Sequence, residues 1–218
     1  MESATAEKSV IAVIDYGMGN IRSVTNSLSF VGADFRILTK PEEIAGANGL
    51  LLPGVGALRD CIKALQDSGL DKAIAEWIAA DRPFLGVCLG LQALFEHSEE
   101  AGIPGLGIFP GSVVRFKVPK GLKVPHMGWN SAEFTREDSI MNAGIENGRD
   151  QFYFVHSYHV DTPDEDLIWA HTDYGYPFVS AISRGRVFAT QFHPEKSQSK
   201  GLQVYRNFVR LAAESVAF

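Results

Sequence analysis

The residues best suited to chemistry begin with a cysteine between two glycines. The segment Gly86-Val87-Cys88-Leu89-Gly90 has the spacing G-x-C-x-G and ends an apolar run that predicts a buried strand. Glycines around a nucleophile allow a sharp, strained turn from strand to helix that projects the reactive atom above the sheet. The turn also places the thiol at a helix N-terminus, whose partial positive charge favours a thiolate. Cys88 is therefore a candidate nucleophile; the alternative is a buried cysteine that only fills space.

A histidine and a glutamate near the C-terminus could serve that nucleophile. His193 and Glu195 flank Pro194 in the run Ala189–Glu195, which follows a predicted strand. A cysteine nucleophile needs a base, and the base needs an acceptor that orients it. We therefore predict that Glu195 orients His193 and that His193 serves Cys88. The alternative is a surface turn with an ordinary histidine and glutamate.

Alternating strands and helices must position these side chains. Apolar runs predict strands at Val10–Tyr16, Phe35–Leu38, Gly49–Leu52 and Pro83–Cys88. Apolar residues at helical spacing predict helices that begin near Ile21, Leu58, Leu70, Leu91 and Leu202. Strands that are apolar throughout and alternate with helices indicate a parallel sheet covered on both faces.

The second half of the chain predicts further strands, which we expect to add antiparallel strands to the same sheet. These candidates are Val113–Phe116, Gln151–Val160, Leu167–His171, Phe178–Ile182 and Val187–Phe192. The expected fold class is α/β: one domain with a mixed, mostly parallel central sheet, helices on both faces and extra antiparallel strands. We expect residues 1–9 to be a polar N-terminal extension and residues 10–218 to form the domain.

Composition disfavours several classes of protein. Of 218 residues, 45% are hydrophobic and 21% charged, with a formal net charge of −6, so the chain is globular and a nucleic-acid partner is disfavoured. Two cysteines, Cys61 and Cys88, are too few for a disulfide framework. The polar start has no signal-peptide pattern, and no apolar stretch reaches the roughly 20 residues of a membrane helix. We expect a cytoplasmic protein without a membrane partner.

We expect neither a metal nor a cofactor. His156 and His159 are three apart in an apparent strand, so their side chains should point to opposite faces. The sequence has no Cys-x-x-Cys or His-Glu-x-x-His spacing. The Gly17-x-Gly19 turn lacks the third glycine of a dinucleotide-binding fingerprint.

Several motifs resemble those of the class I, or triad-type, glutamine amidotransferases. They are Asp15–Asn20, Leu52–Ala57, Gly86–Phe95, Pro125–Asn130, Tyr153–Tyr158 and Ala189–Gln198. Within that family, Pro125–Asn130 and Tyr153–Tyr158 are similar to the glutaminase subunits of imidazole glycerol phosphate synthases. The resemblance runs from Val10 to the C-terminus.

The resemblance implies a role for each matching residue. Cys88 would attack the side-chain amide of L-glutamine, His193 would transfer protons, and Glu195 would hold His193. An oxyanion would be bound by backbone groups of the turn Gly54, Val55 and Gly56 and by the N–H of Leu89. The pocket for glutamine would include Gln92, Ser157 and Tyr158.

The resemblance also implies a partner. In water, free ammonia becomes non-nucleophilic ammonium, so a glutaminase of this kind passes ammonia directly to a synthase. In the imidazole glycerol phosphate synthases, the partner of the glutaminase subunit is a (β/α)₈-barrel cyclase subunit. The heterodimer makes imidazole glycerol phosphate and AICAR in histidine biosynthesis. The residues expected at the interface are Asn20, Met127, Trp129 and Lys196. The chain departs from the family pattern at His159, where an aromatic residue is commoner, and in its longer N-terminal extension.

Other functions remain open at this point. The chain could be the glutaminase subunit of another synthase, such as one that makes a vitamin or a nucleotide, although Pro125–Asn130 argues against this. It could be a cysteine peptidase or a thiol-based stress protein on a related sheet. It could also be a non-catalytic interaction module that has kept the fold.

Overall fold

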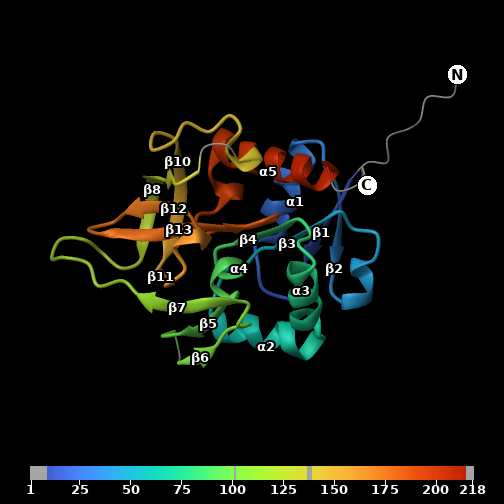
Figure 1. Ribbon diagram of the computed structural model, residues 1–218, viewed down its shortest axis with the longest axis horizontal. Helices are drawn as coiled ribbons and strands as arrows, with labels where there is room; N and C mark the ends of the chain where they lie inside the picture. Colours follow the sequence, from blue (N-terminus) through green and yellow to red (C-terminus); the bar gives the residue numbers. More distant parts are fainter. Residues whose placement is uncertain (1–8, 101, 137–138, 215–218) are drawn as a thin grey trace, which may run out of the picture.

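The computed structural model describes residues 9–100, 102–136 and 139–214 (Figure 1). Residues 1–8 of the expected N-terminal extension lie outside the described residues. The strands are β1 (Val10–Ile14), β2 (Asp34–Leu38), β3 (Gly49–Leu52), β4 (Phe84–Val87), β5 (Phe95–Ser98), β6 (Ile103–Pro104), β7 (Phe109–Arg115), β8 (His126–Ser131), β9 (Glu133–Phe134), β10 (Gln151–His156), β11 (Tyr158–Asp161), β12 (Ile168–Asp173), β13 (Pro177–Arg184) and β14 (Val187–Thr190). The α-helices are α1 (Ile21–Phe30), α2 (Leu58–Ser68), α3 (Leu70–Ala79), α4 (Leu89–Gln92) and α5 (Gln198–Ala213).

A mixed sheet runs through the molecule. In the described residues it has 12 strands, and its main path is β2-β1-β3-β4-β14-β13-β11-β7-β5-β6. The pairs from β2 to β14 along this path are all parallel, and β13 and β11 continue it with antiparallel pairs. Strands β8 and β10 form a separate two-stranded antiparallel sheet. The expected α/β class, with a mostly parallel centre and antiparallel additions, is therefore confirmed.

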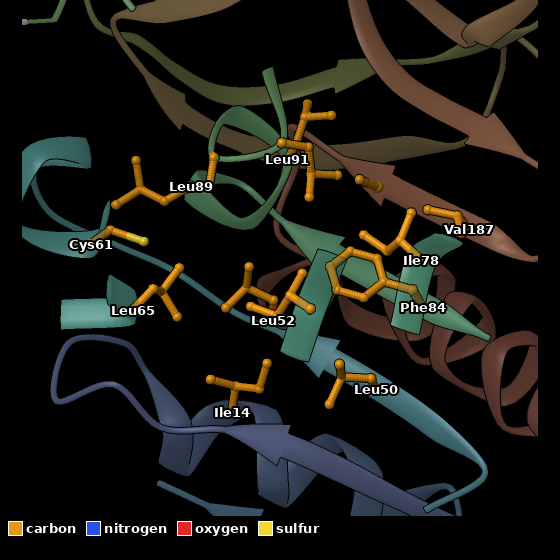
Figure 2. Close-up of a cluster of buried hydrophobic side chains, with 14 of the residues drawn as sticks. Ile14, Leu50, Leu52, Cys61, Leu65, Ile78, Phe84, Leu89, Leu91 and Val187 are labelled. Atoms are coloured by element: carbon orange, nitrogen blue, oxygen red, sulfur yellow. The ribbon is translucent and has the colours of Figure 1, made fainter. Parts of the chain in front are cut away.

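The central strands are apolar throughout because both of their faces are covered. In β3, Leu50 and Leu52 pack on one face and Leu51 on the other. Helices α2 and α3 cover the first face, where Figure 2 shows Leu50, Leu52 and Phe84 packed among helix side chains. Helices α1 and α5 cover the other face (Figure 1). Side chains alternate between the two faces of a strand, so each face receives its own buried cluster.

Three expectations about the elements were wrong. The helix expected over Leu91–Phe95 ends at Gln92, because the carbonyls of Ala93 and Leu94 accept hydrogen bonds from Leu106, Ile108 and Phe109. The expected strand Gln151–Val160 breaks at Ser157 into β10 and β11, which belong to different sheets. Strand β14 was expected among the antiparallel additions. It pairs antiparallel with β13 but parallel with β4, so it is the last strand of the parallel core.

In the described part of the chain, no helix combines the length and the apolar character that crossing a membrane takes.

Candidate active site

Cys88 sits on a strained turn between β4 and α4. Its backbone has φ 54° and ψ −102°, a conformation that L-residues rarely adopt. The turn is held by the Cys88 N–H, which donates to Thr190 O at 2.7 Å, and by the Cys88 carbonyl, which accepts from the N–H groups of Leu91 and Gln92. This is the geometry that the G-x-C-x-G spacing predicts for a nucleophile elbow.

The flanking glycines are required by close backbone approach. A Cβ on Gly90 would lie 2.0 Å from Leu52 O, and a Cβ on Gly86 would lie 2.6 Å from Gly90 O. Any larger residue at either position would therefore push the helix away from the sheet. Both glycines therefore allow α4 to pack closely against the ends of β3 and β4.

His193 and Glu195 form a buried pair. His193 Nδ1 and Glu195 Oε1 are 2.8 Å apart, with side-chain exposures of 1% and 2%. The His193 N–H donates to Tyr153 O at 2.9 Å, and its carbonyl accepts from Ser197 Oγ at 2.6 Å. The bond at Nδ1 leaves Nε2 as the nitrogen available to Cys88 and to a ligand.

The electrostatics of this site favour a charged imidazole. Burial by itself lowers the pKa of His193, but the negative charge of Cys88, followed by the hydrogen bond and the charge of Glu195, outweighs burial and raises it to about 10. His193 therefore carries a proton at neutral pH whenever Cys88 is a thiolate. Such a pair can provide a nucleophile and an acid at the same time.

Cys88 and His193 line one cavity, although they are distant in the sequence. The cavity has a volume of about 430 Å³, and its wall includes Val55, Gly56, Cys88, Leu89, Gln92, Ser157, Tyr158, His193 and Lys196. These residues include the nucleophile, the base and most of the residues expected to bind an oxyanion or a substrate. Tertiary folding therefore brings the predicted groups together around one space.

The turn expected to bind an oxyanion packs directly on the elbow. A Cβ on Gly54 would lie 2.6 Å from both Leu89 Cβ and Tyr16 Oη, so only glycine fits there. Gly56 has φ 101°, which again favours glycine. The backbone of this turn and that of Leu89 therefore stand at the same edge of the cavity as Cys88.

Gln92 is the best placed of the residues expected to bind substrate. It is 3% exposed, and its Nε2 donates to Tyr158 O at 3.1 Å and to Gln191 Oε1 at 3.0 Å. These bonds use both N–H groups, so Gln92 can offer a ligand only its carbonyl oxygen. An acceptor of this kind suits the ammonium group of an amino acid. Ser157 and Tyr158 complete this side of the cavity.

One residue of this site, Gln191, was not predicted from the sequence. Gln191 is fully buried, and its Nε2 donates to Cys88 Sγ at 3.6 Å. A polar side chain at the end of the apolar strand β14, two residues before His193, was the signal that could have identified it.

The residues expected at a partner interface lie in two places. Met127 and Trp129 on β8 are large apolar side chains that are 61% and 44% exposed. The Tyr153 ring lies 5.9 Å from the ring of Trp129 and 6.0 Å from Lys196 Nζ. It therefore connects β8 to the turn that carries His193 and Glu195. Tyr153 itself is half-buried. Asn20 caps α1 by accepting from Ser23 N–H.

Three other histidines, His126, His156 and His159, gather in an aromatic cluster. His156 and His159 do not point to opposite faces of one strand, because the chain breaks at Ser157 and both rings pack against Phe116, at 5.1 and 4.8 Å. Among the described residues, no three His, Cys, Asp or Glu side chains gather closely enough to hold a metal ion.

Comparison with known proteins assigns a family to this arrangement. The family model "Glutamine amidotransferase class-I" matches residues 12–212. Imidazole glycerol phosphate synthase subunit HisH of Nitrosococcus oceani is 52% identical over 205 residues, which are 92% of this chain and 97% of that protein. The HisH subunit of Dehalococcoides mccartyi is 47% identical over 204 residues, 93% of this chain and 98% of that protein. The solved structure of PurLQS from Thermotoga maritima has a TM-score of 0.74 at 16% identity and covers 93% of this chain and 98% of its own, a likeness of fold alone.

Proposed function

This chain belongs to the class-I glutamine amidotransferase family, and from that premise we propose that it is the glutaminase subunit of an imidazole glycerol phosphate synthase. The observation that carries the proposed chemistry is the meeting of Cys88 and His193 in one cavity, with Glu195 2.8 Å behind the imidazole. The relatives named as imidazole glycerol phosphate synthase subunits support the choice of this synthase over others.

The first half of the reaction forms a thioester. The Cys88 thiolate attacks the side-chain carbonyl carbon of glutamine, and the carbonyl electrons move to oxygen. His193 Nε2 gives its proton to the amide nitrogen, the C–N bond breaks, and ammonia leaves. Glu195 keeps the imidazole oriented and stabilises its charged form.

The second half regenerates the enzyme. The now neutral His193 takes a proton from a water molecule as that water attacks the thioester carbon. The C–S bond then breaks, which restores the thiolate beside the charged imidazole. The new γ-carboxylic acid loses its proton to solvent, and the product leaves as glutamate. The oxyanion of each tetrahedral intermediate would be bound by backbone N–H groups of Leu89 and of the turn Gly54–Gly56, which stand beside Cys88.

The partner that we propose is the (β/α)₈-barrel cyclase subunit, which receives the ammonia. Exposed Met127 and Trp129 support a protein interface at β8, since Met and aromatic residues are enriched at interface cores. Lys196 follows the triad glutamate and also lines the cavity, so this contact face and the reaction site are adjacent. Asn20, at the start of α1, would complete the face.

Cys88→Ala is the variant that tests the proposal. In the complex with the cyclase subunit, we expect glutamate release from glutamine to fall at least 10³-fold, on the order of the loss seen when a covalent nucleophile is removed. Synthesis of the cyclase product from added ammonium salt should continue, because it does not need the thiol. Cys61→Ala, the same change at a buried cysteine of α2, is the matched control and should retain activity.

Partner dependence is the second part of the same experiment. In relatives of this kind the Gly54–Gly56 turn can flip and leave the oxyanion hole unformed until the partner binds. We therefore expect the isolated chain to release glutamate roughly 10²–10³-fold more slowly than the complex, the loss that an incomplete oxyanion hole causes. Loss of both glutamine- and ammonium-dependent synthesis in Cys88→Ala would make Cys88 a structural residue. Full activity without the cyclase, or assembly only with a different synthase, would contradict the proposed partner.

A further inference from the structure

Gln191 is a buried amide to which the mechanism above assigns no role. It follows β14, whose residues are all buried, and its own exposed fraction is 0%. A buried amide costs free energy unless its polar atoms find partners. An apolar residue would avoid that cost, so the partners of this side chain indicate why a glutamine is present.

Both ends of the Gln191 amide have partners in the active site. Nε2 donates to Cys88 Sγ at 3.6 Å, and Oε1 accepts from Gln92 Nε2 at 3.0 Å. Gln92 is itself oriented, because its other N–H donates to Tyr158 O. Turning the Gln191 amide over would place its NH₂ group against that of Gln92, so the surroundings determine which end faces the sulfur.

The backbone holds Gln191 in this position. Its N–H donates to Ser180 O at 2.8 Å, while the carbonyl of the preceding Thr190 accepts from the Cys88 N–H at 2.7 Å. The end of β14 therefore holds the nucleophile twice, once through a backbone bond at Thr190 and once through the side chain of Gln191.

We propose that Gln191 is a positioning residue of the glutaminase site, which holds the Cys88 sulfur through an N–H···S hydrogen bond and connects it to Gln92. This inference rests on the proposed function. A hydrogen bond to the charged form of a group stabilises that form, so the amide favours a thiolate at Cys88. Because the same amide also binds Gln92, it sets the distance between the side chain expected to bind glutamine and the atom that attacks it.

The test is the rate at which iodoacetamide alkylates Cys88 in the full-length protein as a function of pH, with peptide mapping to separate Cys88 from Cys61. Gln191→Met keeps the length of the side chain and removes the donor. Gln191→Glu replaces the donor with an acceptor that repels a thiolate. We expect the pH profile to move up by about one unit in Gln191→Met and further in Gln191→Glu, which is about tenfold slower alkylation, or more, on the acid limb of the profile. Gln66→Glu, on an exposed position of α2, is the matched control and should keep the original profile.

Turnover gives a second measurement. In the complex with the cyclase, we expect kcat for glutamine hydrolysis to fall about tenfold in Gln191→Met, while synthesis from ammonium salt is unchanged. A side chain that only fills space would not move the pH profile of a folded variant. Unchanged profiles in both variants would overturn the proposal, as would loss of the folded circular dichroism spectrum in both. Alkylation needs no glutamine, so its result stands even if glutamine hydrolysis itself is not found.

Discussion

The buried histidine of the candidate active site and two buried histidines of the aromatic cluster have pKa values that are shifted in opposite directions. His193 is 1% exposed and has a pKa raised to about 10, whereas His126 and His156, at 3% and 5%, have pKa values lowered to about 4 and about 3. Burial is nearly the same at all three side chains. The difference must therefore come from what surrounds each ring.

His126 and His156 are surrounded by aromatic rings. The His126 ring stacks on Tyr174 at 4.0 Å and on Phe154 at 4.8 Å, and His156 lies 5.1 Å from Phe116. Burial is the main cause of their lowered pKa values, and the charges of neighbouring histidines lower the pKa of His156 further. Within the described part of the chain, no carboxylate bonds to either ring. Their hydrogen bonds suit neutral rings, with Nδ1 of His156 donating to Tyr158 O and Nε2 accepting from Nδ1 of His126 at 3.1 Å.

His193 differs because it has anionic neighbours. The Glu195 carboxylate lies 2.8 Å from Nδ1, and the negative charge of a Cys88 thiolate is the largest of the effects that raise the pKa of the ring. In a buried site these charges are poorly screened, so they reverse the effect of burial. A buried imidazole is therefore neutral and structural by default, and it becomes an acid–base group where the fold also buries an anion beside it.

Glu195→Gln should have the largest effect, because it removes one of the two anions that distinguish His193 from the other histidines and is the one that orients the ring. The amide keeps the shape of the side chain but cannot stabilise a charged imidazole. We expect the rate of glutamine hydrolysis in the complex to fall on the order of 10³-fold. The measurement is glutamate release, with Glu165→Gln at an exposed position as the control. Retention of a tenth of the original rate would mean that the carboxylate does not control His193.

Acid stability tests the other side of the comparison. Between pH 6.5 and 4, unfolded His126 and His156 bind protons that the folded rings do not, so the free energy of unfolding falls as pH falls. We expect a loss of roughly 1 kcal/mol per pH unit for each histidine in this window. The measurement is urea unfolding at several pH values.

The double variant His126→Phe with His156→Phe should lack this acid-dependent loss. Tyr158 O would still accept from Gln92, and Asn130 would still donate to Asp173 O, so few polar groups lose all their partners. His97→Gln, at an exposed position, is the control and should follow the original curve. Parallel pH curves for the double variant and the original protein would show that other groups cause the acid instability.

Tyr205→Phe should have the smallest effect. Tyr205 on α5 is fully buried, and burial, followed by the charge of Glu195, raises the pKa of its hydroxyl well above the ordinary value, so the phenol is neutral and lies close enough to Glu195 to interact with that charge. The neutral phenol therefore supports the carboxylate that orients His193. We expect glutamine hydrolysis to slow roughly tenfold, less than in Glu195→Gln. A rate equal to that of the original protein would show that Glu195 needs no support from α5.

Much of this molecule could be predicted from local sequence. The predicted strand Gly49–Leu52 and the helices near Leu58 and Leu70 match β3, α2 and α3, because short apolar runs and helical stripes depend on neighbours a few residues away. The glycines around Cys88 predicted the elbow for the same reason. His193 and Glu195 are two residues apart, so their pairing could also be predicted before any fold was known.

Only the tertiary structure decided the contacts that join distant segments. Helix α4 ends early because residues 106–109 bond to the carbonyls of Ala93 and Leu94, which follow it. Strand β8 forms because β10, some twenty residues further along the chain, pairs with it. The bond from Gln191 to Cys88 and the aromatic surroundings of His126 likewise depend on chain segments that meet only after folding. Residue type and spacing thus determined which groups could react. Burial and the proximity of an anion, which arise only in the packed fold, decided which histidine carries the proton.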